Sequence, residues 1–175
     1  MRGHMEYQGF PTTDELLAKQ TSDPKMVGAL SYGLVAGAIA GGLWFAIVMV
    51  TQHELGLVAV AVGWLIGQAV VLGSGGKRGL RLQLLSVLFT LATMAGAEYF
   101  ILRELVVAYL GDQVGAAQAA TLPVFLPLDL AVDLVTSGIQ DDPLELLFWG
   151  IALYAAFGVP GVVPVATPKP APAST

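Results

Sequence analysis

A group of carboxylates in the second half of the chain has the clearest chemical potential. Its members are Asp129, Asp133, Asp141, Asp142 and Glu145. Carboxylate oxygens are ligands that divalent cations prefer, so the group could hold a metal ion or, through Mg²⁺, a diphosphate. The competing interpretation is a solvated acidic face, with Asp141 or Asp142 capping the following helix. We favour the second interpretation and expect no metal, no cofactor and no catalytic residue.

Glu98 is the only charged residue between Leu82 and Leu102. An acid inside a membrane span marks an ion or proton pathway by default. Measured from Arg81, however, Glu98 lies about 25 Å along a hydrocarbon slab of about 30 Å, which is close to the headgroups. We therefore expect Glu98 and Arg103 to be interfacial anchors or part of a structural ion pair. An ion- or proton-conducting Glu98 is the alternative.

The composition says what kind of chain must position these groups. Of its 175 residues, 55% are hydrophobic and only 12% are charged, and the mean hydropathy is +0.73. A soluble domain of this size could not bury so much apolar surface, and a nucleic-acid binder would need a basic face. The absence of cysteine excludes disulfides, thiolate zinc sites and cysteine nucleophiles. These observations predict an integral membrane protein.

Long uncharged runs predict an all-α fold with four transmembrane helices in a domain over 26–167. Their ranges are 26–51, 55–74, 80–110 and 143–166. The fourth is the shortest, because Leu144 to Val159 gives only about 24 Å of helix, and it spans only if the helix continues past Pro160. The loop over 111–142 should carry an interfacial amphipathic helix with Asp129 and Asp133 on its wet face.

The flanking segments add less. Residues 1–25 form a polar N-terminal segment, in which Thr12 to Glu15 resembles a capping box that opens a short helix. Residues 168–175 are a mobile Pro/Ala-rich tail.

Basic residues predict the orientation. All but Arg103 fall before the first run, between the second and third runs, or after the fourth, namely Lys19, Lys25, Lys77, Arg78, Arg81 and Lys169, with Arg2 in the extreme N-terminal stretch. By the positive-inside rule, both termini are cytoplasmic.

Glycines recur every four residues in the first two runs. They are Gly33, Gly37, Gly41, Gly63 and Gly67. Small residues on one face let membrane helices approach closely, so we expect these glycines to be helix-packing residues. Two uses are open: they pack the first helix against the second within one subunit, or they form an interface between subunits.

Two stretches carry a family resemblance. One runs from Tyr32 to Gly37 and on through Glu54 to Gly67, and the other from Leu146 to Pro160. Together they resemble a group of uncharacterised bacterial four-helix membrane proteins, some of which carry a zinc-ribbon or B-box-like head. The resemblance implies a bacterial inner-membrane location and assigns no activity. The zinc head is absent here, since the chain has no cysteine.

These observations favour a non-catalytic membrane scaffold or accessory subunit, which acts by glycine-mediated helix packing in a homo-oligomer or a larger complex. Its expected partners are the lipid bilayer and itself or other membrane subunits, with no nucleic acid. The alternative is a small transporter or channel with Glu98 near its outer mouth. A third hypothesis is a metal-dependent membrane enzyme that uses the aspartates.

Overall fold

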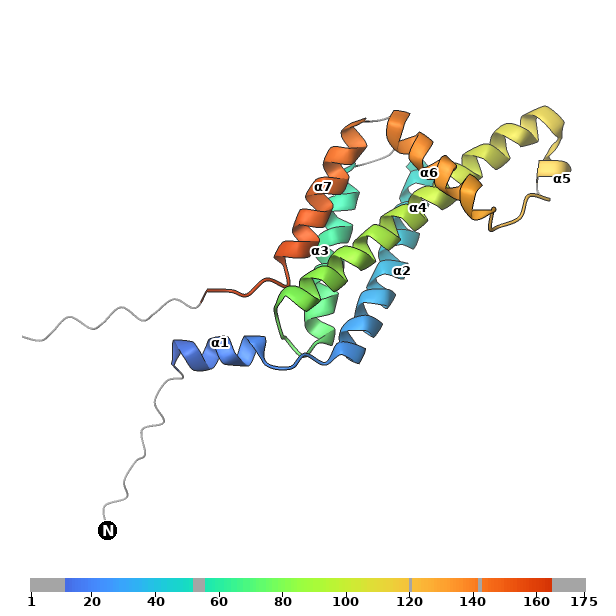
Figure 1. Ribbon diagram of the computed structural model, residues 1–175. Helices are drawn as coiled ribbons and strands as arrows, with labels where there is room; N and C mark the ends of the chain where they lie inside the picture. The colour runs from blue at the N-terminus through green and yellow to red at the C-terminus, as the bar shows by residue number, and fades with distance from the viewer. Residues whose placement is uncertain (1–11, 52–55, 120, 142, 165–175) are drawn as a thin grey trace, which may run out of the picture.

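The computed structural model describes residues 12–51, 56–119, 121–141 and 143–164, and within these it contains helices and turns but no strand. The helices are α1 (Thr13–Thr21), α2 (Met26–Thr51), α3 (Gly56–Gly73), α4 (Leu80–Val114), α5 (Ala116–Ala119), α6 (Leu128–Asp141) and α7 (Pro143–Gly158). The predicted all-α fold is confirmed for the described part of the chain (Figure 1).

Three helices, α2, α3 and α4, are long and apolar enough to cross a membrane. They correspond to the first three predicted spans and mark the chain as an integral membrane protein. The 35 residues of α4 make a helix of about 52 Å, which is longer than the hydrocarbon core of about 30 Å. One end of α4 accordingly projects beyond the bundle (Figure 1).

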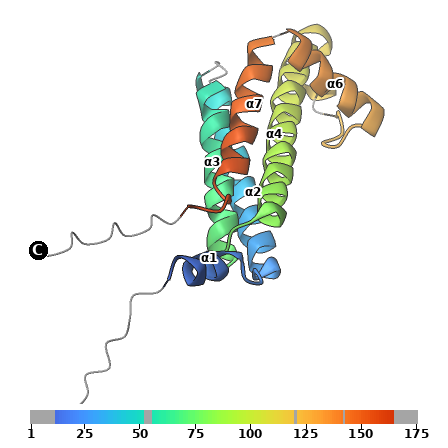
Figure 2. The ribbon, with the colours of Figure 1, turned by 60° about the vertical axis from the view of Figure 1, so that its left-hand side comes forward.

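The bundle is centred on α3 and α4, which contact each other and each contact both α2 and α7. The helices α2 and α7 flank this pair on opposite sides, as the two views show together (Figures 1 and 2). The core between them is formed mainly by small and aliphatic side chains, among them Ala29, Ala36, Ile66 and Val70. Large apolar side chains on the outer faces stay exposed, since Val27, Leu57 and Leu72 are 79%, 74% and 68% accessible. Exposed apolar faces of this extent suit contact with lipid.

The helix α7 ends at Gly158, well short of the predicted limit at residue 166. The helix does not continue past Pro160, because proline lacks an amide N–H and disfavours a helical conformation in the residue before it. Instead, the carbonyls of Val159 and Gly161 accept hydrogen bonds from Arg78 Nη1. The cation thus satisfies backbone carbonyls of the segment that follows the helix and holds that segment against the start of α4.

The turn between α3 and α4 is a Schellman motif. The amide of Gly76 donates to Val71 O at 2.9 Å and the amide of Gly75 donates to Leu72 O at 3.1 Å. Both glycines have positive φ, +81° for Gly75 and +76° for Gly76, which other residues rarely adopt. We call this end of the bundle, with Lys77, Arg78 and Arg81, the basic end.

The short helix α1 lies across the basic end (Figure 1). The predicted capping box is confirmed, because the amide of Glu15 donates to the Thr12 hydroxyl and the Glu15 carboxylate accepts from the Thr12 amide. Lys77 Nζ donates to the carbonyl of Lys19 at 2.8 Å. The side chain of Gln20 exchanges two hydrogen bonds with the backbone of Val163. These bonds bring both ends of the described chain to the same end of the bundle.

Candidate functional site

The glycines of α2 face α4. A Cβ added at Gly33 would lie 2.6 Å from the ring of Phe89, and one added at Gly37 would lie 2.6 Å from Thr93 Oγ1. Gly41 also faces Thr93. Of the two uses left open by the sequence, contact with the second helix or with another subunit, neither is the contact that these glycines make here, which is with α4. The repeat of four gives the face of the helix but does not say which helix lies opposite.

The glycines of α3 face α7. A Cβ added at Gly63 would meet the carbonyl oxygen of Ala152, and one added at Gly67 would lie 2.9 Å from Val159 Cβ. The close glycine contact between α2 and α3 is instead Gly28 against Gly73, where each backbone occupies the space of the other's missing side chain. All of the predicted helix-packing glycines therefore pack inside this chain. Gly28 and Gly73 were not among the predicted packing residues. They could have been predicted from the sequence, because the start of α2 and the end of α3 must lie side by side in an antiparallel hairpin.

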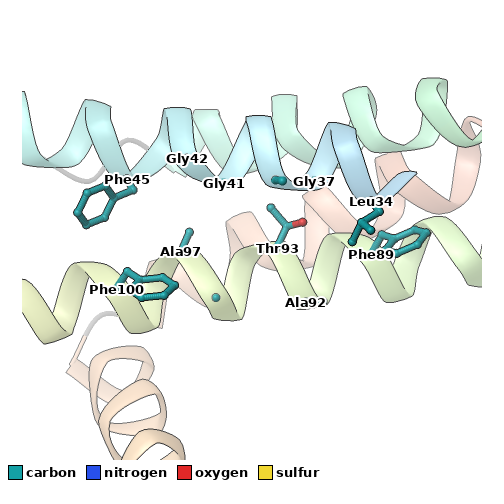
Figure 3. Close-up of a pocket in the computed structure, with 12 residues that line it drawn as sticks. Leu34, Gly37, Gly41, Gly42, Phe45, Phe89, Ala92, Thr93, Ala97 and Phe100 are labelled. Atoms are coloured by element: carbon teal, nitrogen blue, oxygen red, sulfur yellow. The ribbon is translucent and has the colours of Figure 1, made fainter. Parts of the chain in front are cut away.

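An open groove follows the outward side of the α2–α4 contact. Its volume is about 470 Å³, and Figure 3 shows Phe45 and Phe100 toward one end and Leu34 and Phe89 toward the other. Between them the groove is lined by small residues, namely Gly37, Ala38, Gly41, Gly42, Ala92, Thr93, Gly96 and Ala97. A Cβ added at Gly42 or Gly96 would meet no atom within 4 Å. Close packing within the chain accounts for neither glycine.

An aromatic contact links one end of this groove to the segment before α6. The ring of Phe100 packs edge-on against Phe125 in the segment before α6, with centroids 6.4 Å apart. That segment is held by Tyr99, whose hydroxyl donates to Val124 O and accepts from the amide of Leu126, both at 2.9 Å. A hydrogen-bonded loop therefore packs against Phe100, one of the aromatic residues that line the groove.

Arg103 holds the same loop. Its guanidinium donates to the carbonyls of Leu122 and Pro123 at 3.1 and 3.2 Å, and its Nη1 pairs with Glu104 at 2.5 Å. Tyr99 and Arg103 stand one turn apart on α4 and so reach the same segment. Arg103 thus pairs with Glu104 and fixes the segment at 122–126, whereas its predicted role as an interfacial anchor stays a prediction. The i, i+4 spacing was the available signal.

Glu98 lies in the core rather than at the surface. It is 1% exposed and continues the buried face of α4 that also carries Ser86, Thr90 and Met94. This burial does not suit an anchor that reaches water near the headgroups, because depth along a helix does not give the direction of a side chain. The structural ion pair and the ion or proton pathway stay predictions. The hydroxyl of Ser86 donates to Ala156 O at 2.6 Å and that of Thr90 to Ser86 O at 2.8 Å.

Trp44 lies in the same layer as Glu98. Gly33 faces Phe89 and Gly37 faces Thr93, so α2 and α4 run parallel and Trp44 falls at the level of Glu98. Trp44 is 3% exposed, and its indole Nε1 has no hydrogen-bond acceptor among the described residues. A buried donor and a buried carboxyl thus share one layer of the core.

The acidic group is only partly described. Asp129 and Asp133 lie on α6 and are exposed. The side chains of Asp141 and Glu145 and the whole of Asp142 fall outside the described residues. Within the described part of the chain, no three acidic or histidine side chains are grouped to hold a metal ion. Comparison with protein-family models, with curated proteins and with solved structures gives no match for this chain.

Proposed function

We propose that this protein is a non-catalytic membrane scaffold or accessory subunit that receives a transmembrane helix of a partner in the α2–α4 groove. The observation that carries the proposal is the pair of glycines, Gly42 and Gly96, that line the groove and face open space. Glycine inside a helix costs about 1 kcal/mol relative to alanine. No contact within the described chain offsets that cost at Gly42 or Gly96, whereas close contact with an approaching helix would offset it.

The lining of the groove suits a helix as its occupant. Ala38 and Gly42 repeat at a spacing of four on α2, as do Ala92 and Gly96 on α4. Small residues at that spacing let a neighbouring backbone approach closely enough for dispersion contacts, which drive association where lipid removes the hydrophobic force. The partner is a second copy of the chain or another membrane subunit.

The proposal includes a topology of four spans with both termini on the cytoplasmic side of a bacterial inner membrane. The helix α7 ends at Gly158, so the fourth span cannot be the longer helix expected from the sequence. A fourth crossing by this shorter helix is supported by its packing along α3 and α4 and by the hydrogen bonds that hold Val159 and Val163 at the basic end. The hydrogen bonds between Gln20 and Val163 support a common side for the termini. The basic residues of the α3–α4 turn favour the cytoplasm for that side. A bulky residue at Gly42 tests the function itself.

The test compares three glycine-to-leucine variants of the full chain purified in mild detergent. We expect Gly42→Leu and Gly96→Leu to reduce the assembled mass measured by native mass spectrometry. Gly150→Leu is the matched control, because Gly150 is also an exposed helical glycine with no atom within 4 Å of an added Cβ. A wild-type chain that runs alone, or an equal loss in the control, contradicts the proposal.

The second candidate function is a small transporter or channel that uses Glu98. A carboxyl only 1% exposed in the core, in one layer with the indole of Trp44, favours it. Proton or cation flux into proteoliposomes should then fall at least tenfold in Glu98→Gln. Flux that is the same in this variant and in wild type removes this candidate.

A further inference from the structure

A second cavity, of about 290 Å³, lies at the basic end between the α1–α2 linker and the start of α4. Its lining is Thr21, Asp23, Pro24, Arg78, Gly79, Leu80, Arg81 and Leu82. The apolar helices α2 and α4 begin at Met26 and Leu80, so the cavity lies where the hydrocarbon ends and the headgroups begin. It is separate from the α2–α4 groove and shares no residue with it.

Two guanidinium groups line this cavity, and they differ in how they are held. Arg78 is fixed, because its Nη1 donates to the carbonyls of Val159 and Gly161. Arg81 is exposed, and its side chain makes no hydrogen bond or ion pair with any of the described residues. Asp23 lines the same cavity without pairing with it. The cavity therefore presents one fixed cation and one whose donors are all available, and together they outweigh the single carboxylate of Asp23.

The position of Arg81 raises the local positive charge further. It stands in the first turn of α4, where the helix dipole disfavours a cation. Gly79 precedes that helix and supplies no side-chain cap. An anion bound between the arginines would relieve this unfavourable arrangement.

We propose that this cavity binds a phosphate group, held by Arg81 and Arg78 at the membrane surface. Arginine is suited to phosphate because its planar donors match two phosphate oxygens at once. The neighbouring Leu80 is 62% exposed, so an apolar surface adjoins the cations. Such a site takes the headgroup of an acidic phospholipid or a free phosphate ion, which share this chemistry.

The experiment measures binding to the full chain in neutral detergent, with three probes titrated separately. The probes are phosphatidylglycerol, phosphatidylcholine and inorganic phosphate, and the dissociation constant is taken from native mass spectrometry and from thermal shift. We expect phosphatidylglycerol to bind more tightly than phosphatidylcholine. Arg81→Gln should weaken that binding about tenfold, because a hydrogen bond to a charged group is lost.

The control is Lys19→Gln, which removes the same charge at the same end but lies outside the cavity. It should change the dissociation constant by no more than about twofold. Arg81→Lys keeps the charge and loses the planar donors, so its affinity should fall between wild type and Arg81→Gln. Because Arg81 makes no hydrogen bond or ion pair with the described residues and stands where the helix dipole disfavours a cation, Arg81→Gln should not lower the melting temperature without ligand.

The outcomes separate the two sources of phosphate. Tight binding of phosphatidylglycerol alone identifies a lipid site, and binding of inorganic phosphate with the same ranking of variants identifies a site for the free ion. Equal binding of the two lipids, or equal weakening by Lys19→Gln and Arg81→Gln, overturns the proposal. None of these results depends on a partner helix in the α2–α4 groove.

Discussion

The α3–α7 contact and the α2–α4 groove both carry small residues at a spacing of four, but only one is filled. On α3, Gly63 and Gly67 lie against the backbone and side chains of α7, so the chain provides its own occupant. On the outward side of α2 and α4, Gly42 and Gly96 face open space. A glycine repeat therefore indicates an external partner only where no helix of the same chain packs against the glycines.

The largest expected effect comes from filling the α3–α7 contact. Gly63→Leu would drive a side chain into the backbone carbonyl of Ala152, which cannot move without displacing α7. We expect a loss of about 3 kcal/mol or more in stability, at the upper end of what overpacking costs. Thermal unfolding in detergent, with proteolysis of α7 as a second readout, measures it. A melting temperature equal to that of wild type would mean that α7 is not seated on α3.

A smaller loss is expected at Gly37, where the obstacle is a side chain. Gly37→Leu would meet Thr93 Oγ1, which can rotate away in part. We expect a cost of about 1–3 kcal/mol from separation of α2 and α4. The same unfolding assay measures it, and combining the variant with Thr93→Ala should recover part of the loss. If migration and stability in detergent stay unchanged, Gly37 is not a packing residue.

A still smaller loss of stability is expected from weakening the loop that Tyr99 holds beside the groove. Tyr99→Phe removes a hydroxyl that donates to Val124 O and accepts from the Leu126 amide, so we expect about 1–2 kcal/mol of local destabilisation. Hydrogen exchange should rise over residues 121–127 and remain at the wild-type level in α3. Thr136→Val, which removes a hydroxyl bonded only within α6, is the control. Equal exchange in wild type and Tyr99→Phe would show that the loop is held by other contacts.

The smallest effect on the free chain is expected at the open glycine. A side chain at Gly42 has no neighbour to displace, and Gly42→Leu lowers the conformational entropy of the unfolded chain. The stability of the isolated chain should therefore change by less than about 1 kcal/mol, toward greater stability. A drop in melting temperature as large as that of Gly37→Leu would show that the groove is already filled from within.

Much of the fold could be predicted from the sequence because its signals are local. Uncharged runs give α2, α3 and α4, and the pattern from Thr12 to Glu15 gives the start of α1. The end of α7 could have been predicted too, since Pro160 is itself a helix-ending signal, and the expected continuation to residue 166 gave that signal too little weight.

The candidate site depended on what lies opposite each helix face, which a periodicity does not state. The repeat of Gly33 and Gly37 predicts a packing face but fits α3 as well as α4. The burial of Glu98 follows from its being one turn past Met94 on the inward face of α4. The groove itself arises from two glycines far apart in the sequence, so only the packed helices bring it together.

Cross-linking in native membranes tests whether a partner helix occupies the α2–α4 groove. The chain contains no cysteine, so a single introduced thiol reports on one position alone. Treated with a short thiol-to-amine or thiol-to-thiol cross-linker, Gly42→Cys should yield an adduct of higher mass, and Gly150→Cys should yield none. If a partner helix occupies the groove, the Gly42→Cys adduct should disappear when Gly96→Leu is added, because the leucine side chain would fill the groove. An adduct that persists in that double variant, or that forms equally from Gly150→Cys, would contradict the proposal that a partner helix occupies the α2–α4 groove.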